Sequence, residues 1–261
     1  MDSSLWVAKT GLDAQQRRMT VVANNLANVN TTGFKRDRAV FEDLLYQTLR
    51  QPGAQMDQNS NSPTGLVLGT GTRVVATEKI HSQGNLLQTD NALDLAIDSN
   101  GFLQTLRADG PIGYTRDGSL KLNNNGQLVT ANGNLLQPEV TIPNNARSIT
   151  IGKDGTVSVQ TFDQPAAQMV GNIQIANFIN PAGLQAVGGN TYVQTAASGE
   201  SQVQVPSQDG AGALVQGSLE ASNVNVVEAM VNMIETQRAY EVNSKAIAAA
   251  DGMLRFINNN L

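Results

Sequence analysis

Two long stretches with a seven-residue apolar repeat, one at each end of the chain, constrain the fold most strongly. Near the N-terminus, steps of alternately three and four residues give a mostly apolar series: Leu5, Ala8, Leu12, Gln15, Met19, Val22, Leu26 and Val29. Near the C-terminus, positions seven apart are Val226, Met233, Tyr240, Ile247, Leu254 and Leu261. Since neither stretch can bury its stripe alone, the repeat predicts two long helices that pair as a coiled coil.

Local signals predict where both helices end. Ser3 or Ser4 can cap the first helix, and Thr31-Thr32-Gly33 closes it. Asn225 followed by Glu228 forms an Asn-type capping box for the second helix, which is expected to run to about residue 258. We therefore expect a helix in residues 1–30, a connecting segment in 31–70, a β-rich domain in 71–212, and a connector with the second helix in 213–261.

The residues between the helices change to a strand pattern. Alternating or β-branched runs occupy residues 114–122, 127–130, 148–151 and 156–160, and further strands are expected around 94–106 and 170–179. Asp-Gly and Asn-Gly pairs between these runs predict hairpin turns. The polar stretch 47–65 is expected to be an extended loop or linker, while Phe41 to Leu49 fit either a short helix or an extended segment. The predicted fold class is α+β, with paired terminal helices and an inserted, mainly antiparallel β domain.

The composition removes most catalytic chemistry. The 261 residues include no Cys and one His, and the net charge is −5. These values exclude thiol catalysis, disulfides and Cys/His zinc sites, and they argue against a nucleic-acid binder. His81 is expected to be a structural residue, and the short run Lys35–Arg38 to be a solvated face. We expect no catalytic, cofactor-binding or metal site, and hence no enzyme.

Neither a membrane-spanning run nor the features of a cleavable signal peptide are found in the sequence. The chain is therefore expected either to remain in the cytoplasm or to be exported with its N-terminus intact.

The helices carry many uncharged amides. Residues Thr20 to Val29 contain no charge, whereas a solvated helix face normally carries Glu and Lys. Amides donate and accept hydrogen bonds, so we expect these faces to pack against other copies of the chain. Helix nucleation is costly without packing, so isolated subunits are expected to have largely disordered ends. A secreted adhesin is the rival from another class, and the scarcity of aromatic residues argues against its binding groove.

Several segments resemble a known family. The run "GLDAQQRRM" with "ANNLANVNTTGFK" (Ala23–Lys35), and the segment Ser222–Asp251, resemble the two terminal signatures of the bacterial flagellar rod and hook family. Leu93–Gln104 and Tyr114–Thr130 resemble its β-domain motifs. The resemblance covers essentially the whole chain.

The resemblance implies a structural subunit that self-assembles helically into the rod of the flagellar basal body, a drive shaft that crosses the periplasm and transmits torque from motor to hook. The opening "SSLWVAKTGLDAQQ" and the stretch Arg38–Gln55 favour the distal part of the rod, with a proximal rod subunit as the alternative. Residues 47–65 are implied to add inter-subunit contacts that stiffen the rod.

The partners that the resemblance implies are other copies of the chain, the proximal rod proteins, the hook protein, the P- and L-ring proteins and the flagellar export apparatus. It implies no nucleic acid, no membrane insertion and no cofactor. The assembly interface is expected on the paired helices and at the exit of the first one. Its candidate residues are Leu12, Met19, Asn24, Asn25, Leu26, Asn28, Gly33, Phe34, Asn225, Glu228, Met233, Gln237, Tyr240, Asn243 and Ile247.

Overall fold

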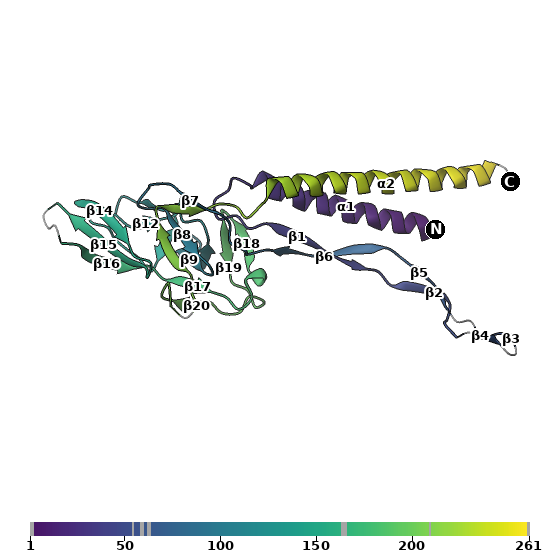
Figure 1. Ribbon diagram of the computed structural model, residues 1–261, viewed down its shortest axis with the longest axis horizontal. Coiled ribbons are helices and arrows are strands. Elements are labelled where there is room, and N and C mark those ends of the chain that lie inside the picture. Colours follow the sequence, from purple (N-terminus) through teal and green to yellow (C-terminus); the bar gives the residue numbers. More distant parts are fainter. Residues whose placement is uncertain are drawn as a thin grey trace. The chain divides into compact units, whose positions relative to one another are not determined.

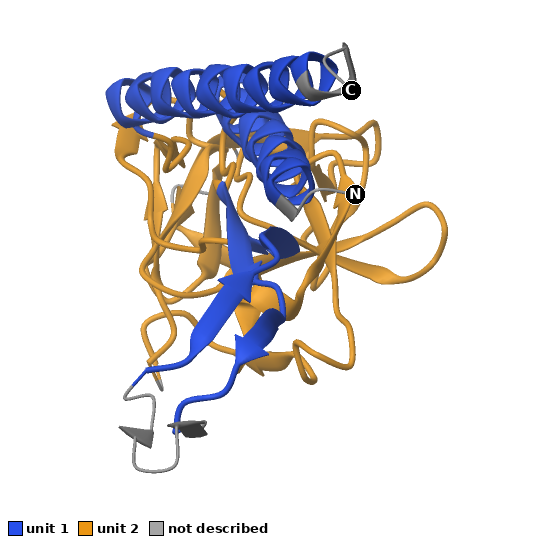
Figure 2. Ribbon diagram, turned by 90° about the vertical axis from the view of Figure 1, so that its right-hand side faces the viewer, with its two compact units in different colours: residues 1–27, 37–78, 225–261 blue, residues 28–36, 79–224 orange. Residues whose placement is uncertain are grey.

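The structure, a computed structural model, describes residues 3–53, 55–57, 60–61, 64–162, 166–208 and 210–259. The chain divides into two compact units, which Figure 2 colours separately. Unit 1 comprises residues 1–27, 37–78 and 225–261, and unit 2 comprises residues 28–36 and 79–224. The chain therefore passes from one unit to the other at residues 27–28, 36–37, 78–79 and 224–225.

Unit 1 contains both predicted helices. Helix α1 spans Ser3–Ala27 and helix α2 spans Val226–Asn259, which confirms the two terminal helices, although α1 ends before residue 30. They run antiparallel and in contact with each other (Figure 1). The predicted cap is confirmed because Asn225 Oδ1 accepts hydrogen bonds from the backbone N–H groups of Val227 and Glu228.

The face of α2 that contacts α1 includes only part of the predicted series. Its buried or half-buried residues are Met233 and Ile247 of that series, together with the small or polar residues Ala229, Asn232, Thr236, Ala239, Asn243 and Ala250. Arg18 Nη2 donates to Asn232 Oδ1 over 3.2 Å, and a Cβ on Gly11 would lie 3.1 Å from Asn243 Nδ2. Val226, Tyr240 and Leu254 of the predicted series are 40–41% exposed, so these three members lie at the edge of the contact. Leu261 lies outside the described residues.

Unit 1 also contains three pairs of strands. Strand β1 (Asp37–Asp43) pairs with β6 (Thr72–Lys79), β2 (Tyr46–Arg50) pairs with β5 (Leu66–Gly69), and β3 (Gln55–Asp57) pairs with β4 (Ser60–Asn61). The expectation of a loop or linker over 47–65 is therefore wrong for the described residues of that stretch, which are largely strand. The polar composition of the stretch does not reveal this pairing, because the partner of β2 is β5, which begins only after residue 65. Residues 54, 58–59 and 62–63 lie outside the described residues.

Unit 2 is built from short, mostly antiparallel strands. Their bounds are β7 Leu86–Gln88, β8 Leu95–Asp98, β9 Phe102–Leu106, β10 Ile112–Thr115, β11 Lys121–Leu122, β12 Leu128–Val129, β13 Leu135–Gln137, β14 Ala146–Ile151, β15 Thr156–Thr161, β16 Gln168–Asn172, β17 Ile175–Asn177, β18 Gln185–Gly188, β19 Thr191–Val193, β20 Gln202–Gln204, β21 Ala213–Gln216 and β22 Ser218–Glu220, with a 3₁₀ turn η1 at Pro181–Gly183.

These strands form four sheets within unit 2. The largest has nine strands in the order β11-β12-β13-β9-β10-β19-β18, and β17 joins it by pairing with β9 and β20. Strands β14, β15 and β16 form a second sheet, β8 pairs with β21, and β7 pairs with β22. The predicted hairpin of residues 148–151 and 156–160 is confirmed as β14 and β15. Its turn contains Gly155 at φ +85°, a conformation that Gly adopts without a steric cost.

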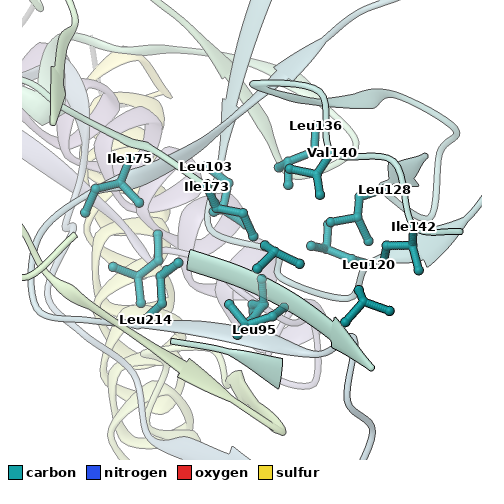
Figure 3. Close-up of a cluster of buried hydrophobic side chains, with 14 residues drawn as sticks. Leu95, Leu103, Leu120, Leu128, Leu136, Val140, Ile142, Ile173, Ile175 and Leu214 are labelled. Atoms are coloured by element: carbon teal, nitrogen blue, oxygen red, sulfur yellow. The ribbon is translucent and has the colours of Figure 1, made fainter. Parts of the chain in front are cut away.

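Strand β9 contributes side chains to two buried clusters of unit 2, one on each of its faces. Leu103 belongs to the main hydrophobic core, which Figure 3 shows together with Leu120, Leu136 and Ile173. The neighbouring Phe102 belongs to a smaller, aromatic cluster with Tyr114, Phe178 and Tyr192. Successive side chains of a strand point to opposite faces, so one strand separates the two clusters.

Replacing Leu103, which is fully buried, by Ala is expected to lower the free energy of unfolding of unit 2 by about 2–5 kcal/mol, because the change leaves a cavity in the core. Leu122→Ala is the matched control, since Leu122 is 41% exposed and the loss should stay within about 1 kcal/mol. Urea denaturation followed by circular dichroism measures both. Equal effects of the two variants would contradict the assignment of the core.

Candidate assembly interface

The face of α2 that is turned away from the helix contact carries an apolar stripe. Val227, Met230, Val231 and Ile234 are 71, 52, 50 and 49% exposed, respectively. Their spacing of three, four and seven residues places them on one side of the helix. Contiguous exposed apolar side chains of this kind mark an interaction surface. We call these four residues the α2 stripe.

A second exposed apolar region is the hairpin of β2 and β5 in unit 1. Every residue of both strands is exposed, and Tyr46, Leu49, Leu66, Val67 and Leu68 are among them. A two-stranded hairpin is only marginally stable in water without a covering surface. The hairpin therefore has the properties of a segment that packs against other molecules.

The predicted interface residues fall into three groups. Half-buried side chains on the helices are Leu12, Met19, Leu26, Met233, Asn243 and Ile247. Exposed ones are Asn24, Asn225, Glu228, Gln237 and Tyr240, while Asn25 and Gly33 are buried and Asn28 and Phe34 are half-buried. Their role in assembly stays a prediction. The four residues of the α2 stripe are not among these candidates, because the seven-residue series lies on the other side of the helix.

Asn25 has its hydrogen-bond partners within its own chain. Its Nδ2 donates to the backbone oxygen of Asp37, and its Oδ1 accepts from the backbone N–H of Asp37, both over 2.8 Å. Asn28 Oδ1 likewise accepts from Thr31 Oγ1 over 3.2 Å. The Asn25 amide thus ties the last turn of α1 to the first residue of β1, a role that the pattern of amides does not predict.

Lys35 lies at the centre of a buried ion cluster in unit 2. Its Nζ is 2.6 Å from Glu220 Oε1 and 2.7 Å from the backbone oxygen of Ser82, and both charged side chains are fully buried. The expectation that Lys35 belongs to a solvated face is therefore wrong. The anionic partner lies far along the chain, where a local sequence pattern cannot show it. We call Lys35, Arg116 and Glu220 the buried ion cluster.

Arg116 completes this cluster. Its Nη1 lies 3.4 Å from Glu220 Oε2 and donates to the backbone oxygen of Ile97, and its Nη2 donates to that of Ser99 over 2.6 Å. One carboxylate thus faces two cations, and backbone carbonyl dipoles stabilise the remaining charge. Burial, and then the charge of Arg116, lower the pKa of Lys35, while the charge of Glu220 acts in the opposite direction.

Gly33 allows the chain to approach this cluster closely. Its φ is +67°, and its N–H donates to the backbone oxygen of Glu220 over 2.8 Å. A Cβ at this position would lie 2.7 Å from the carbonyl carbon of Arg116, so a larger residue would collide with the backbone. The "TTGFK" ending of the first signature is therefore explained by Gly33 and Lys35 together.

Asn223 holds three segments together beside the cluster. Its Oδ1 accepts from the backbone N–H of Arg36 over 2.8 Å, and its Nδ2 donates to the backbone oxygens of Ile80 and Ser82. Its own N–H donates to the backbone oxygen of Phe34 over 3.4 Å. This Asn of the second terminal signature therefore binds the first one.

His81 packs next to the buried ion cluster. Its ring lies edge-on to Phe102 and Tyr192, with ring centroids 5.5 and 5.6 Å apart. Burial, and then the nearby charges of Lys35 and Arg116, lower the pKa of His81 from 6.5 to about 4. The imidazole is therefore neutral at neutral pH and serves as a packing residue.

Within the described ranges, no group of three or more His, Cys, Asp or Glu side chains could hold a metal ion. In the same part of the chain, neither α1 nor α2 is apolar enough over its length to cross a membrane. What the surface offers is an apolar helix face and an apolar hairpin. The fold and this surface are those of a structural subunit that exposes apolar side chains on a helix and on a hairpin.

Comparison with known proteins identifies the family. Residues 5–35 match the flagella basal body rod protein family, 96–159 match the flagellar hook protein FlgE/F/G D1 domain, and 215–260 match the C-terminal region of flagellar basal body rod FlgEFG proteins. The chain is 54% identical over 255 residues to the flagellar basal-body rod protein FlgG of Buchnera aphidicola from Schizaphis graminum, covering 98% of each chain. It is 47% identical to FlgG of Caulobacter vibrioides over 97% of each chain, and 37% identical to FlgG of Bacillus subtilis over 98% of each chain.

The chain therefore belongs to the flagellar basal-body rod protein FlgG family, within the FlgE/F/G rod and hook proteins. It is a structural subunit of the flagellar basal-body rod, and the assignment to the distal rod is confirmed.

Asn25→Ala is expected to lower the free energy of unfolding of unit 1 by about 1–3 kcal/mol, because it removes both hydrogen bonds between the buried Asn25 amide and the half-buried backbone of Asp37. Asn24→Ala is the control at the adjacent, exposed position and should have a smaller effect. Chemical denaturation monitored by the fluorescence of Trp6 in α1 reports on this unit. A larger loss in the Asn24 variant would contradict the role of Asn25.

Protonation of His81 is expected to destabilise unit 2 in acid. The folded pKa of about 4 lies below the unfolded value of 6.5, so the unfolded state binds the proton first as the pH falls. Stability is retained above pH 6.5 and decreases between about pH 6.5 and 4, by ~3 kcal/mol at most. NMR titration of the imidazole measures the pKa, and His81→Phe should remove this part of the pH dependence. A midpoint near 6.5 in the folded protein would show that the ring is not held neutral.

Proposed function

We propose that this chain forms the distal rod as a helical homopolymer held together by its terminal helices, and that the rod transmits torque from motor to hook. The observation that carries this proposal is the α2 stripe. The antiparallel contact with α1 uses mainly small and polar residues of α2, together with Met233 and Ile247, and it leaves the four apolar side chains of the α2 stripe exposed on the outer face. With this arrangement, one face of α2 is covered by α1, and the opposite face is available for contacts with neighbouring subunits.

The stripe is large enough to matter energetically. Burial of an exposed Val, Ile or Met side chain contributes about 1.5–3 kcal/mol when it is complete. Four side chains that are at least 49% exposed can therefore contribute several kcal/mol for each subunit that joins. In a helical assembly every subunit repeats this contact, so a modest gain per copy stabilises a long polymer.

The hairpin of β2 and β5 supports a second set of contacts between subunits. Its exposed apolar side chains lie on both of its faces, because Tyr46 and Val67 alternate with Leu66 and Leu68 along the paired strands. Packing of both faces requires more than one neighbour or a deep groove between neighbours. This is the property expected of a segment that stiffens a rod.

The partners in this proposal follow from the place of the rod in the basal body. They are other copies of the chain, the proximal rod proteins at one end, the hook protein at the other, and the P- and L-ring proteins around the shaft. The subunit reaches this site through the flagellar export apparatus.

Ile234→Asp is expected to abolish polymerisation of the purified protein, because a charge would be buried without a partner in the contact between copies. Ile179→Asp is the matched control: Ile179 is 81% exposed in unit 2, outside the helices, and tubes should still form. Electron microscopy and sedimentation measure assembly, and circular dichroism verifies that both variants fold. Tubes formed by the Ile234 variant with normal stability would contradict the α2 stripe as the assembly surface.

A further inference from the structure

The buried ion cluster lies where the chain leaves unit 2. The segments next to three of the crossings are 33–36, 80–84 and 220–223, which continue into unit 1 at residues 37, 78 and 225. Any force that travels along the backbone from one unit to the other passes through such crossings. Contacts that join these segments therefore decide whether they move as one body or separately.

All three segments are joined to one another in unit 2. Gly33 N–H donates to the oxygen of Glu220, Ile80 N–H to that of Arg36, and Asn223 N–H to that of Phe34. Side chains add to this set, since Lys35 Nζ binds Ser82 and Glu220, and Glu220 Oε1 also accepts from the N–H of Gly84 over 2.9 Å. Glu220 thus contacts both of the other segments.

The composition of the cluster makes these contacts interdependent. Glu220 is the one carboxylate in a buried site that holds two cations, Lys35 and Arg116. If segment 33–36 separates from segment 220–223, the charges of Lys35 and Glu220 stay buried without each other, and this costs far more than the loss of a neutral hydrogen bond. Hydrophobic residues would hold the segments together as well, but they would allow sliding, because their contacts are not directional.

We propose that the buried ion cluster, together with Asn223, is a clamp that makes the crossing segments of each subunit one rigid element and so gives the rod part of its stiffness. This inference rests on the proposed function, because it assigns the clamp to the passage of torque between the helical unit and the β unit. The clamp joins the two terminal signatures of the chain. A force transmitted along either of these two segments therefore passes through the same site.

The first test is hydrogen exchange of the full-length subunit carrying Glu220→Gln. The amides of Gly33, Ile80 and Asn223 bind backbone oxygens and not the Glu220 side chain, so their exchange reports on coupling. All three are expected to exchange about tenfold faster or more, while the core amide of Ile173, which binds Gly155, keeps its rate. Asp109→Asn is the matched control, because the Asp109 side chain, which pairs with Arg107, is 75% exposed. Faster exchange at only one of the three amides would overturn the clamp.

Lys35→Met provides a second variant if Glu220→Gln does not fold, because it leaves Arg116 paired with Glu220 and introduces no unpaired anion. The same three amides should again exchange faster together.

The second test measures stiffness of assembled tubes. The persistence length of tubes of the Glu220 variant, obtained from their curvature in electron micrographs, is expected to fall at least about twofold relative to the unchanged protein and to Asp109→Asn. Tubes of equal stiffness would overturn the inference, and so would loss of tubes in this variant alone, since the cluster would then serve assembly instead. Failure of the unchanged protein to form any tubes would instead contradict the proposed function.

Discussion

The contact of Lys35 with Glu220 is the interaction on which the rest of unit 2 depends. It joins the segment that follows α1 to the segment that precedes α2. Burying this pair with Arg116 is costly, and it is tolerated because the oxygens of Ser82, Ile97 and Ser99 accept hydrogen bonds from the two cations. Gly33 is required next to it, since a side chain there would collide with the backbone of Arg116. Residues from the beginning, the middle and the end of the chain thus have to be present before the site can form.

The helices distribute their apolar residues in an unusual way. A helix pair that is stable by itself would bury its largest side chains in the contact, whereas the buried positions of α2 are Ala229 and Thr236, and Met230 and Ile234 stay about half exposed. Thr236 satisfies its hydroxyl within the helix by donating to the oxygen of Asn232. The contact with α1 therefore fixes the orientation of α2, while the side chains of the α2 stripe are left for contacts with other molecules.

The sequence predicts the elements of this structure better than its contacts. The seven-residue repeats and Asn225 predict both helices and the cap, and the turn at Gly155 predicts the hairpin of β14 and β15, because these signals are local. The seam predicted on α2 is right at Met233 and Ile247, which are half-buried, and wrong at Val226, Tyr240 and Leu254, because apolar residues occupy more than one side of the helix and only the position of α1 decides between them. The role of Lys35 depends on a partner far along the chain, which no local pattern reveals.

The opening signature "ANNLANVNTTGFK" is shared by both units, and this explains its mixture of residues. Asn25 completes unit 1 by closing the end of α1 onto Asp37, while Gly33 and Lys35 complete unit 2 at the buried ion cluster. An amide suits the first task because it donates to and accepts from one peptide unit at once. A flexible, charged side chain suits the second, since it reaches a distant carboxylate from a tight turn. The segment does not have the pattern of a single helix because only its first part, up to Ala27, is helical. Its remaining residues belong to unit 2.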